Sequence, residues 1–332
     1  MKYAAITGWG KSVPSRVLTN ADLERMVDTS HDWIVARTGI HERRLAGEGE
    51  TTSTLAAAAG RQAVAQAGLD PLDIDLIVLA TCTPDRPFPA TACAVQARLG
   101  MTRAAAFDVA AACSGFVYGL AVATSMVRSE AARNVLFIAA DMFTHYINWH
   151  DRDTCILFGD GAGAVVLQAS TAPRGQLSSV LSASGADENL MAVDAGGTRL
   201  PATAALLESG RQYVHMHGRE IFKLAVRGMS ETALQAIAAA ALTPDEIALV
   251  IPHQSNLRII EAVTRRLELP SERVFTNLDR YGNTSAASIP IALAEAAEQG
   301  RIRDGDNILV TAFGGGLTWA SAVVRWGGLA PA

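Results

Sequence analysis

An internal repeat constrains the fold of this chain more than any other feature. Residues 69–78 (LDPLDIDLIV) resemble residues 242–251 (LTPDEIALVI), and each segment reads as a turn that leads into a buried strand. A second apolar segment begins 57 residues after each one ends, at Val135 and at Ile308. Self-similarity over such a distance indicates a duplicated supersecondary unit rather than chance.

Each second segment is followed by a further apolar run, at residues 161–167 (GAGAVVL) and 319–324 (WASAVV). The chain has 332 residues, a length for which about two domains are the usual expectation. We therefore predict two similar halves, residues 1–171 and residues 172–332.

Short β-rich runs alternate with longer Ala-rich helical runs along the whole chain, which is typical of an α/β fold. The predicted strands are Ala4–Gly8, Ile74–Ala80, Val135–Ala140, Ala162–Leu167, Ile247–Ile251, Asn307–Ala312 and Ser321–Arg325. The predicted helices are Asn20–Val27, Thr52–Ala67, Thr91–Leu99, Gly115–Arg128, Gly218–Ala241, Leu257–Leu267 and Ser285–Glu298. The Gly-rich stretch Gly185–Gly210 interrupts this pattern and is either a lid or entrance, or a plain surface loop.

Charged residues make up 18% of the chain, less than the usual quarter or so, and hydrophobic residues 49%. This composition excludes a disordered chain and suggests much surface hidden inside the fold or against a partner. The net charge of −5 provides no general attraction for nucleic acid or anionic membranes. An anionic partner would have to be bound by a local basic patch.

Residues 109–127 carry no charge and could be mistaken for a membrane span, but they are rich in Ala, Gly, Ser and Thr. We expect a helix buried in protein instead. The first residues lack the long apolar core of a signal peptide, and the four cysteines form no CxxC pair or disulfide framework. These features predict a soluble, cytoplasmic protein.

Cys113 follows a strand-like Phe-Asp-Val and comes just before the uncharged helix. Free amides and the positive dipole end of a helix stabilise a thiolate, which is the nucleophilic form. A buried, inert cysteine is the common alternative. Position alone therefore leaves both interpretations open.

The second half supplies possible partners for this thiol. His253 lies just past the apolar run that ends at Ile251, and Asn283 lies in a later turn, so both could reach one end of a sheet. Asn283 could equally be a turn residue, with Thr284 or Ser285 capping the next helix. The glycines after Phe313 could present amides to an oxyanion or form only a tight turn.

With these residues the chain resembles the β-ketoacyl-acyl carrier protein (ACP) synthase III family of condensing enzymes. The resemblance covers residues 32–319, nearly the whole chain, and is carried by Asp32–Ile40 with Glu42–Arg44, the segment around Cys113, Leu157–Ala164, Ile251–Ile260, Arg280–Pro290 and Ala312–Trp319. It implies a thiolase-like fold, in which two duplicated α/β halves form α-β-α-β-α layers. This agrees with the repeat.

The resemblance also implies the catalytic groups. Cys113 would be the nucleophile, His253 and Asn283 would complete a triad, and the amides of Cys113 and Gly315 would form the oxyanion hole. Thiolases characteristically have a second cysteine, and elongating synthases a second histidine, where this chain has Asn283. A neutral amide donates a hydrogen bond without competing for protons, which suits decarboxylation of a malonyl group.

The coenzyme A (CoA) site can be argued in part from spacing. Trp33 and Arg37 lie four residues apart on a short predicted helix between Ser30 and Gly39, so they share a face that could hold an adenine. The resemblance assigns Trp33, Arg37, Arg152 and Asn256 to CoA. The alternative is that Trp33 packs in the fold and the arginines pair with nearby acids.

Arg258, Arg265 and Arg266 form a basic stripe on the helix after His253. By resemblance this stripe and Lys223 would dock the acidic carrier protein, although a solvated helix face would look the same. Phe88 matches a family position that reaches across a homodimer into the partner's acyl pocket, which Phe313 would also line. We expect the dimer interface near Pro87–Ala97.

The sequence as a whole predicts an acyltransferase that condenses a short acyl-CoA primer, such as acetyl-CoA, with malonyl-ACP to start type II fatty acid synthesis. The alternatives are a specialised homologue that primes a polyketide or biotin-type pathway, a non-decarboxylating acyltransferase, or a non-enzymatic binding module. CoA enters as a thioester substrate, and no permanently bound cofactor, metal, nucleic acid or membrane partner is expected. His215 and His217 could share a strand face as in metal sites, but no third ligand is evident. The primer's length and branching, the carrier of the extender and the regulation are left open.

Overall fold

The structure is a computed structural model that describes residues 3–329. The main strands are β1 (Tyr3–Ser12), β4 (Leu76–Ala80), β5 (Ala105–Val109), β6 (Asn134–Met142), β7 (Asp160–Ser170), β8 (Gly175–Ala183), β11 (Leu249–Pro252), β12 (Asn307–Gly314) and β13 (Thr318–Arg325). The main helices are α3 (Thr52–Gln66), α4 (Thr91–Leu99), α5 (Gly115–Arg128), α7 (Gly218–Ala239), α8 (Leu257–Arg266) and α10 (Ser288–Glu298). Shorter elements are β2 (Arg16–Thr19), α1 (Asn20–Leu23), α2 (His31–Thr38), β3 (Glu42–Leu45), β9 (Met191–Val193), α6 (Ala204–Glu208), β10 (Val214–Met216) and α9 (Leu278–Tyr281).

Apart from the edge strand β5, the order of the main strands is the same in both halves when each half is followed from its outer edge inward. It runs β11-β12-β13-β8-β1-β7-β6-β4-β5, so the halves meet where β1 lies beside β8. Each half has the same pairing: β4 with β6 and β11 with β12 are parallel, whereas β6 with β7 and β12 with β13 are antiparallel. The counterpart of β5 in the second half is reduced to a single bridge between Val250 and Val274. The predicted duplicated α/β fold is confirmed, and the boundary between residues 171 and 172 stays a prediction.

The halves are joined at one narrow point. Strands β1 and β8 share a single residue pair, Ala4 with Gly175. Gly175 has a φ of +72°, and a Cβ atom there would collide with the carbonyl oxygen of Ala4. Only glycine fits this approach, because it tolerates the left-handed conformation and carries no side chain.

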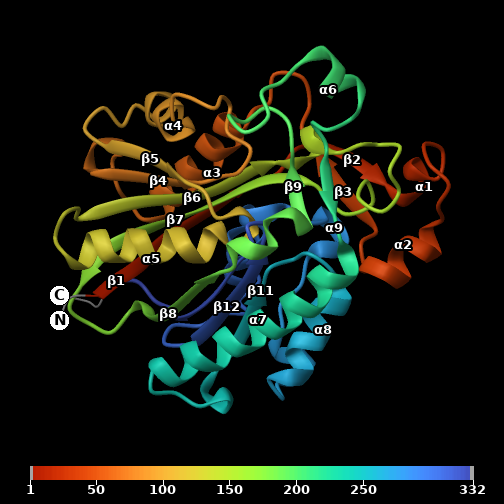
Figure 1. Ribbon diagram of the computed structural model, residues 1–332. Helices are drawn as coiled ribbons and strands as arrows, with labels where there is room; N and C mark the ends of the chain where they lie inside the picture. Colours follow the sequence, from red (N-terminus) through yellow and green to blue (C-terminus); the bar gives the residue numbers. More distant parts are fainter. Residues whose placement is uncertain (1–2, 330–332) are drawn as a thin grey trace.

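Helices and sheet alternate in five layers (Figure 1). The face of β4 with Leu76 and Val78 packs with α5, α10 and β12 in one central cluster. The opposite face, with Ile77 and Leu79, packs against α3 and α4. In the second half, α7 and α8 cover the outer face of the sheet in the same way. Each strand can pack on both sides because its side chains alternate between the two faces of the sheet.

Small residues explain the position of α5 between the two halves. Gly115 lies between Ala80 and Ala286, and a Cβ atom at Gly119 would enter the ring of Phe137. The uncharged stretch is therefore buried in protein, as predicted, although residues 109–114 are not part of the helix. No helix within residues 3–329 is both long and apolar enough to cross a membrane.

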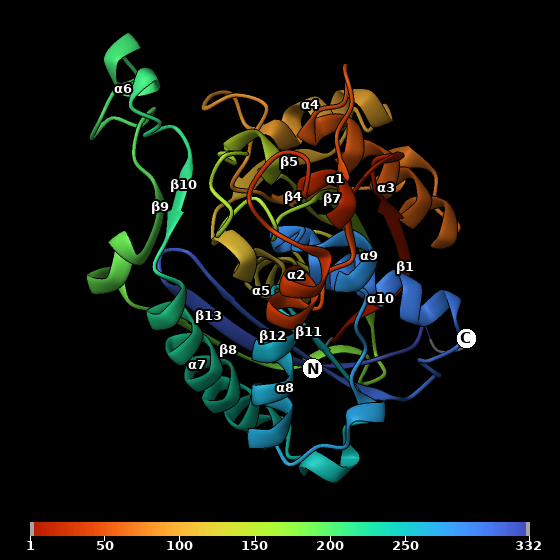
Figure 2. The same ribbon diagram turned by 90° about the vertical axis from the view of Figure 1, so that its right-hand side faces the viewer.

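Some predicted elements differ from the observed ones. The predicted helix Asn20–Val27 ends at Leu23, and the polar strand β8 was not predicted at all. The stretch Gly185–Gly210 contains β9 and α6, and β9 pairs with β10 in a two-stranded ribbon. This excursion projects from the body of the molecule (Figure 2).

Candidate active site

One cavity of about 1250 Å³ receives side chains from both halves of the chain. Cys113 comes from the first half, and His253, Asn283 and Phe313 come from the second. The three residues that the sequence singled out for chemistry thus line the same space.

Cys113 is held in a short 3₁₀ turn, Ala112–Ser114, directly before α5. Its side chain is 3% exposed, and its Sγ lies 3.5 Å from the Oγ of Ser285. Burial raises the pKa of the Cys113 thiol to about 12, although the contact with Ser285 acts in the opposite direction. Of the two interpretations left open by the sequence, burial thus favours the neutral thiol in the free protein.

His253 directly follows β11, and its backbone N–H donates to the carbonyl of Thr311 at 2.8 Å. Burial lowers the pKa of His253 to about 3, so its imidazole is neutral at physiological pH. The Nδ1 atom lies 2.7 Å from the Oγ of Ser288. Ser288 Oγ also accepts the N–H of Gln254 at 3.3 Å, so its own proton is free to donate to Nδ1. This arrangement favours a proton on Nε2.

Asn283 lies at a point where the two halves are connected by backbone hydrogen bonds. Its N–H donates to Leu157 at 2.8 Å, and its carbonyl accepts the N–H of Gly159 at 3.0 Å. Its Oδ1 accepts the N–H of Ser285 at 2.9 Å. Since that oxygen is engaged, the amide offers its NH₂ group as a donor. The turn-residue alternative for Asn283 is thus compatible with a place in the cavity.

The Gly-rich turn after Phe313 packs against the backbone of Cys113. A Cβ atom at Gly314 would lie 2.6 Å from the Cys113 nitrogen, so only glycine allows this approach. Phe313 lines the cavity and stacks on Trp319 with ring centroids 6.1 Å apart. Gly315, whose amide was expected in the oxyanion hole, follows directly, and a Cβ atom built on it would lie 3.8 Å from the Cβ of Ala112.

Trp33, Arg37, Arg152 and Asn256 gather beside the cavity. The guanidinium carbons of Arg37 and Arg152 lie 4.7 and 4.9 Å from the centroid of the Trp33 ring. Asn256 caps α8 and donates to the carbonyl of Arg37 at 3.0 Å, and both residues line the cavity. The four residues expected at the CoA site therefore form one group.

The basic residues divide into two sets. Arg258 and Lys223 line the cavity, whereas Arg265 and Arg266 are exposed at the end of α8. Arg265 lies 3.9 Å from Glu261, a contact between exposed side chains that contributes little. Arg211 and Arg219 also line the cavity and were missed, since no spacing pattern in the sequence distinguishes them.

Two further residues were missed or misread. Ser288, which contacts His253, was not singled out, although the hydroxyl-rich run Asn283–Ser288 was a signal for it. Thr284 and Ser285 do not cap α10, as one alternative proposed.

Phe88 lies on the loop between β4 and α4 and is 85% exposed. It is not among the residues that line the cavity of its own chain. His215 binds the carboxylate of Asp194 at 3.2 Å, and no group of three metal-ligating side chains occurs within residues 3–329.

A duplicated five-layer fold with a thiol, an imidazole and an amide in one cavity defines a condensing enzyme of the acyltransferase type, with a thiolase-like fold. Residues 107–185 match the family described as 3-oxoacyl-[acyl-carrier-protein] synthase III, and residues 237–326 match its C-terminal part. The chain belongs to this family, also called β-ketoacyl-ACP synthase III.

Individual relatives agree along the whole length. The chain is 72% identical to a β-ketoacyl-ACP synthase III from Roseiflexus sp. strain RS-1, over 98% of both chains. It is 53% identical to the enzyme of that name from Symbiobacterium thermophilum, over 98% of this chain and 99% of the relative. The crystal structure of the 3-oxoacyl-ACP synthase III from Aquifex aeolicus superposes with a TM-score of 0.91 at 48% identity, covering 97% of this chain and all of that one.

Proposed function

We propose that the protein is a β-ketoacyl-ACP synthase III that condenses a short acyl-CoA primer with malonyl-ACP. The single observation that carries the proposal is that a nucleophile, a neutral imidazole and an amide donor line one cavity between the halves. We assign the roles of these residues as follows.

In the first half-reaction Cys113 Sγ attacks the thioester carbonyl of acyl-CoA. The amides of Cys113 and Gly315 stabilise the oxyanion, a contribution typically worth a hundred- to a thousand-fold in rate per donor. The bond to the CoA sulfur breaks, and that sulfur leaves with the thiol proton. Because Cys113 begins and ends this step without net charge, a high thiol pKa is compatible with it.

In the second half-reaction malonyl-ACP loses carbon dioxide, and the electron pair of the broken C–C bond forms an enolate. His253 Nε2–H and the Asn283 NH₂ donate hydrogen bonds to the enolate oxygen. The carbanion attacks the acyl-Cys113 carbonyl, the new C–C bond forms and the C–S bond breaks. The released Cys113 sulfur takes a proton from solvent, which its raised pKa favours.

The surroundings of the cavity suggest how the substrates bind. We place the adenine end of CoA at Trp33, Arg37 and Arg152, with Asn256 holding the Arg37 backbone. The acidic carrier protein docks on Lys223, Arg258, Arg265 and Arg266 at the mouth of the cavity. Phe313 lines the acyl pocket, and Phe88 reaches the pocket of the partner in a homodimer. The proposed setting is the cytoplasm, without a bound cofactor.

The test separates the two half-reactions. Wild type, Cys113→Ala and Asn283→Ala are incubated with labelled acetyl-CoA, and covalent acyl-enzyme is measured by mass spectrometry. Malonyl-ACP is then added, and carbon dioxide and β-ketoacyl-ACP are quantified. We expect no acyl-enzyme with Cys113→Ala, and normal acylation with most condensation lost in Asn283→Ala.

Acyl-enzyme on Cys113→Ala would overturn the assignment of the nucleophile, and equal loss of both steps in Asn283→Ala would overturn the division of roles. A wild type that is acylated but never releases carbon dioxide would be a non-decarboxylating acyltransferase.

A further inference from the structure

Glu295 is a buried carboxylate in the apolar helix α10 and does not itself line the cavity. Its neighbours along α10, from Ile289 to Ala296, are buried and almost all apolar, and Glu295 itself is 4% exposed. A buried carboxylate is stable only when it is paired and hydrogen-bonded. The hydrogen-bond partners of Glu295 therefore indicate which segments of the chain the carboxylate holds in place.

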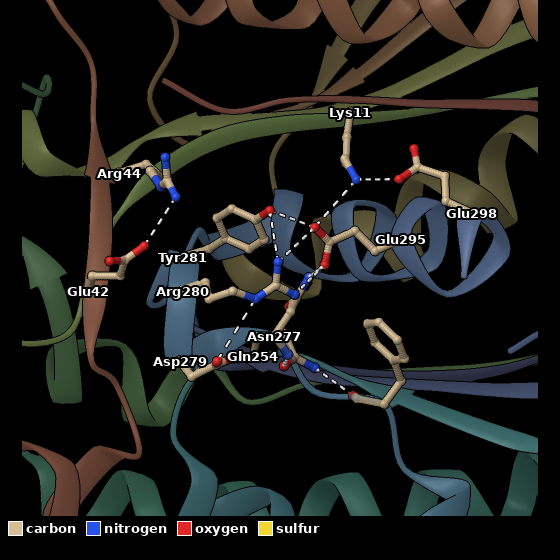
Figure 3. A network of polar contacts seen from close by, with 11 residues as sticks. Lys11, Glu42, Arg44, Gln254, Asn277, Asp279, Arg280, Tyr281, Glu295 and Glu298 are labelled. Atoms are coloured by element: carbon tan, nitrogen blue, oxygen red, sulfur yellow. Dashed lines mark hydrogen bonds and ion pairs between the residues drawn. The ribbon is translucent and has the colours of Figure 1, made fainter. Parts of the chain in front are cut away.

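Four side chains donate to this carboxylate (Figure 3). Tyr281 OH donates to Oε1 at 2.6 Å, and Arg280 NH2 donates to Oε2 at 2.8 Å. Asn277 Nδ2 donates to Oε2 at 3.0 Å, and Lys11 Nζ donates to Oε1 at 3.4 Å. Burial alone would raise the pKa of Glu295, but the hydrogen bonds from Tyr281, Asn277 and Arg280 outweigh it and leave the pKa below its usual value.

Three of these donors belong to the segment that leads directly into Asn283. Arg280 and Tyr281 end α9, and Gly282 follows with a φ of +64° before Asn283 begins. A Cβ atom at Gly282 would lie 2.8 Å from the carbonyl oxygen of Leu157, the acceptor of the Asn283 N–H. The backbone path to Asn283 is therefore tightly determined, and Glu295 fixes its starting point.

The same carboxylate is connected to His253 by two routes. Ser288, which contacts His253 Nδ1, lies seven residues before Glu295 and hence on the same face of α10. Asn277 donates its backbone N–H to Gln254 Oε1 at 3.0 Å, and Gln254 is the residue after His253. Glu295 thus links the supports of both hydrogen-bond donors.

We propose that Glu295 is a positioning residue that holds His253 and Asn283 at a fixed separation for the condensation step. The inference rests on the proposed function, because it assigns the two donors to one enolate oxygen. Acylation of Cys113 uses the backbone amides assigned to the oxyanion hole instead of these two donors and does not need this separation. Loss of Glu295 therefore impairs condensation selectively.

The test uses Glu295→Gln, which keeps the size of the side chain but replaces one acceptor oxygen by an NH₂ group. That group faces donors, so part of the network is lost. We expect condensation with malonyl-ACP to fall at least about tenfold, while acylation by acetyl-CoA in a single turnover stays within about twofold. Glu298→Gln is the matched control, since Glu298 lies one turn further along α10 and its side chain pairs with Lys11 alone within residues 3–329.

A double-variant cycle distinguishes positioning from general stabilisation. If Glu295 acts through Asn283, Glu295→Gln adds less than about twofold to the loss caused by Asn283→Ala. Effects that multiply, or acylation that falls as much as condensation, would overturn the proposal. Wild type that is acylated but does not condense would overturn the proposed function instead.

Tyr281→Phe provides the same test should Glu295→Gln fail to fold. It removes the 2.6 Å hydrogen bond to Glu295 and the 3.4 Å contact from Arg280, and it leaves the ion pair between Arg280 and Glu295 intact. We expect a smaller loss, again confined to condensation. An unchanged condensation rate in this variant would contradict the proposal.

Discussion

At Cys113 two effects act in opposite directions on the same thiol. Cys113 lies in the turn directly before α5, and the positive dipole end of a helix favours a nearby thiolate. The surrounding apolar core excludes water, which favours the thiol, and burial raises the pKa to about 12. Sequence shows the first effect, because a helix start can be recognised from local residues, but not the second, which depends on packing between distant segments.

This balance predicts how Cys113 reacts with an alkylating agent. Well below the pKa of a thiol, its thiolate fraction rises tenfold with each pH unit. The rate of alkylation by iodoacetamide should therefore rise about tenfold per unit from pH 6 to pH 9. The rate is followed by peptide mass spectrometry, which separates Cys113 from the exposed Cys93. A plateau in the Cys113 rate below pH 8 would show that the helix end dominates after all.

Cys113, His253 and Asn283, the proposed catalytic residues, could be singled out from sequence because each lies in a recognisable motif. Ser288 and Glu295 were not, although both contact the supports of His253 and Asn283. Their partners lie 35 and 18 residues away in the chain, a separation that no local pattern reports. The role of such residues becomes visible only when tertiary contacts are known.

At the scale of elements, the long apolar helices agree with their predicted ranges, and α4 and α5 agree at both ends. Helix α4 ends at Gly100, which adopts the left-handed conformation that glycine allows. Strand β8 was missed because Gln176, Ser178, Ser179 and Ser182 interrupt its apolar residues, so no apolar run marks it. It is a strand because β13 pairs along its length. Pairing between distant strands overrides local propensity.

Helix α8 has an apolar face formed by Ile259, Ile260 and Val263, and its arginines point away from the core. If the carrier protein docks there, the double variant Arg265→Glu with Arg266→Glu should raise the KM for malonyl-ACP about tenfold or more. The acylation rate with acetyl-CoA should be unchanged, because neither residue lines the cavity. Steady-state kinetics at two salt concentrations measure both effects, and the wild-type KM should increase with salt.

Arg128→Glu is the charge-matched control for the α8 variants. Arg128 is exposed at the end of α5 opposite to Cys113, about 20 Å away along a helix of this length. An equal rise in KM for the control would mean that net charge rather than a docking site governs the carrier protein's affinity.

For the whole molecule, two features at the β5 edge of the main sheet favour the proposed homodimer. Strand β5 is the last strand of the sheet, and such an edge can pair with another chain. Phe88 is exposed nearby, on the loop that leads into α4, and an exposed aromatic side chain is favourable to bury in an interface. The shortage of charged residues agrees with such an interface.

We therefore expect Phe88→Asp to weaken the dimer. Burial of one Phe contributes at least about 1.5 kcal/mol, and a symmetric dimer buries two, so the dissociation constant should rise about a hundredfold or more. Sedimentation velocity over a concentration series measures it. Leu234→Asp, at an exposed position on the outer helix α7, should leave the dimer intact. A wild type that is monomeric at micromolar concentration, or a dimer indifferent to Phe88→Asp, contradicts this assembly.

The central place of β1 has a consequence for how the chain folds as it is synthesised. Residues 3–12 are synthesised well before their sheet neighbours, since they pair with β7 at residues 160–170 and touch β8 at Gly175. At about 5–20 residues per second, the first strand waits roughly 8 to 30 seconds for its partners. During that time its apolar residues Ala4, Ala5 and Ile6, which are buried in the finished protein, are without their native neighbours. Strand β1 therefore lacks its native sheet neighbours until most of the first half has been synthesised.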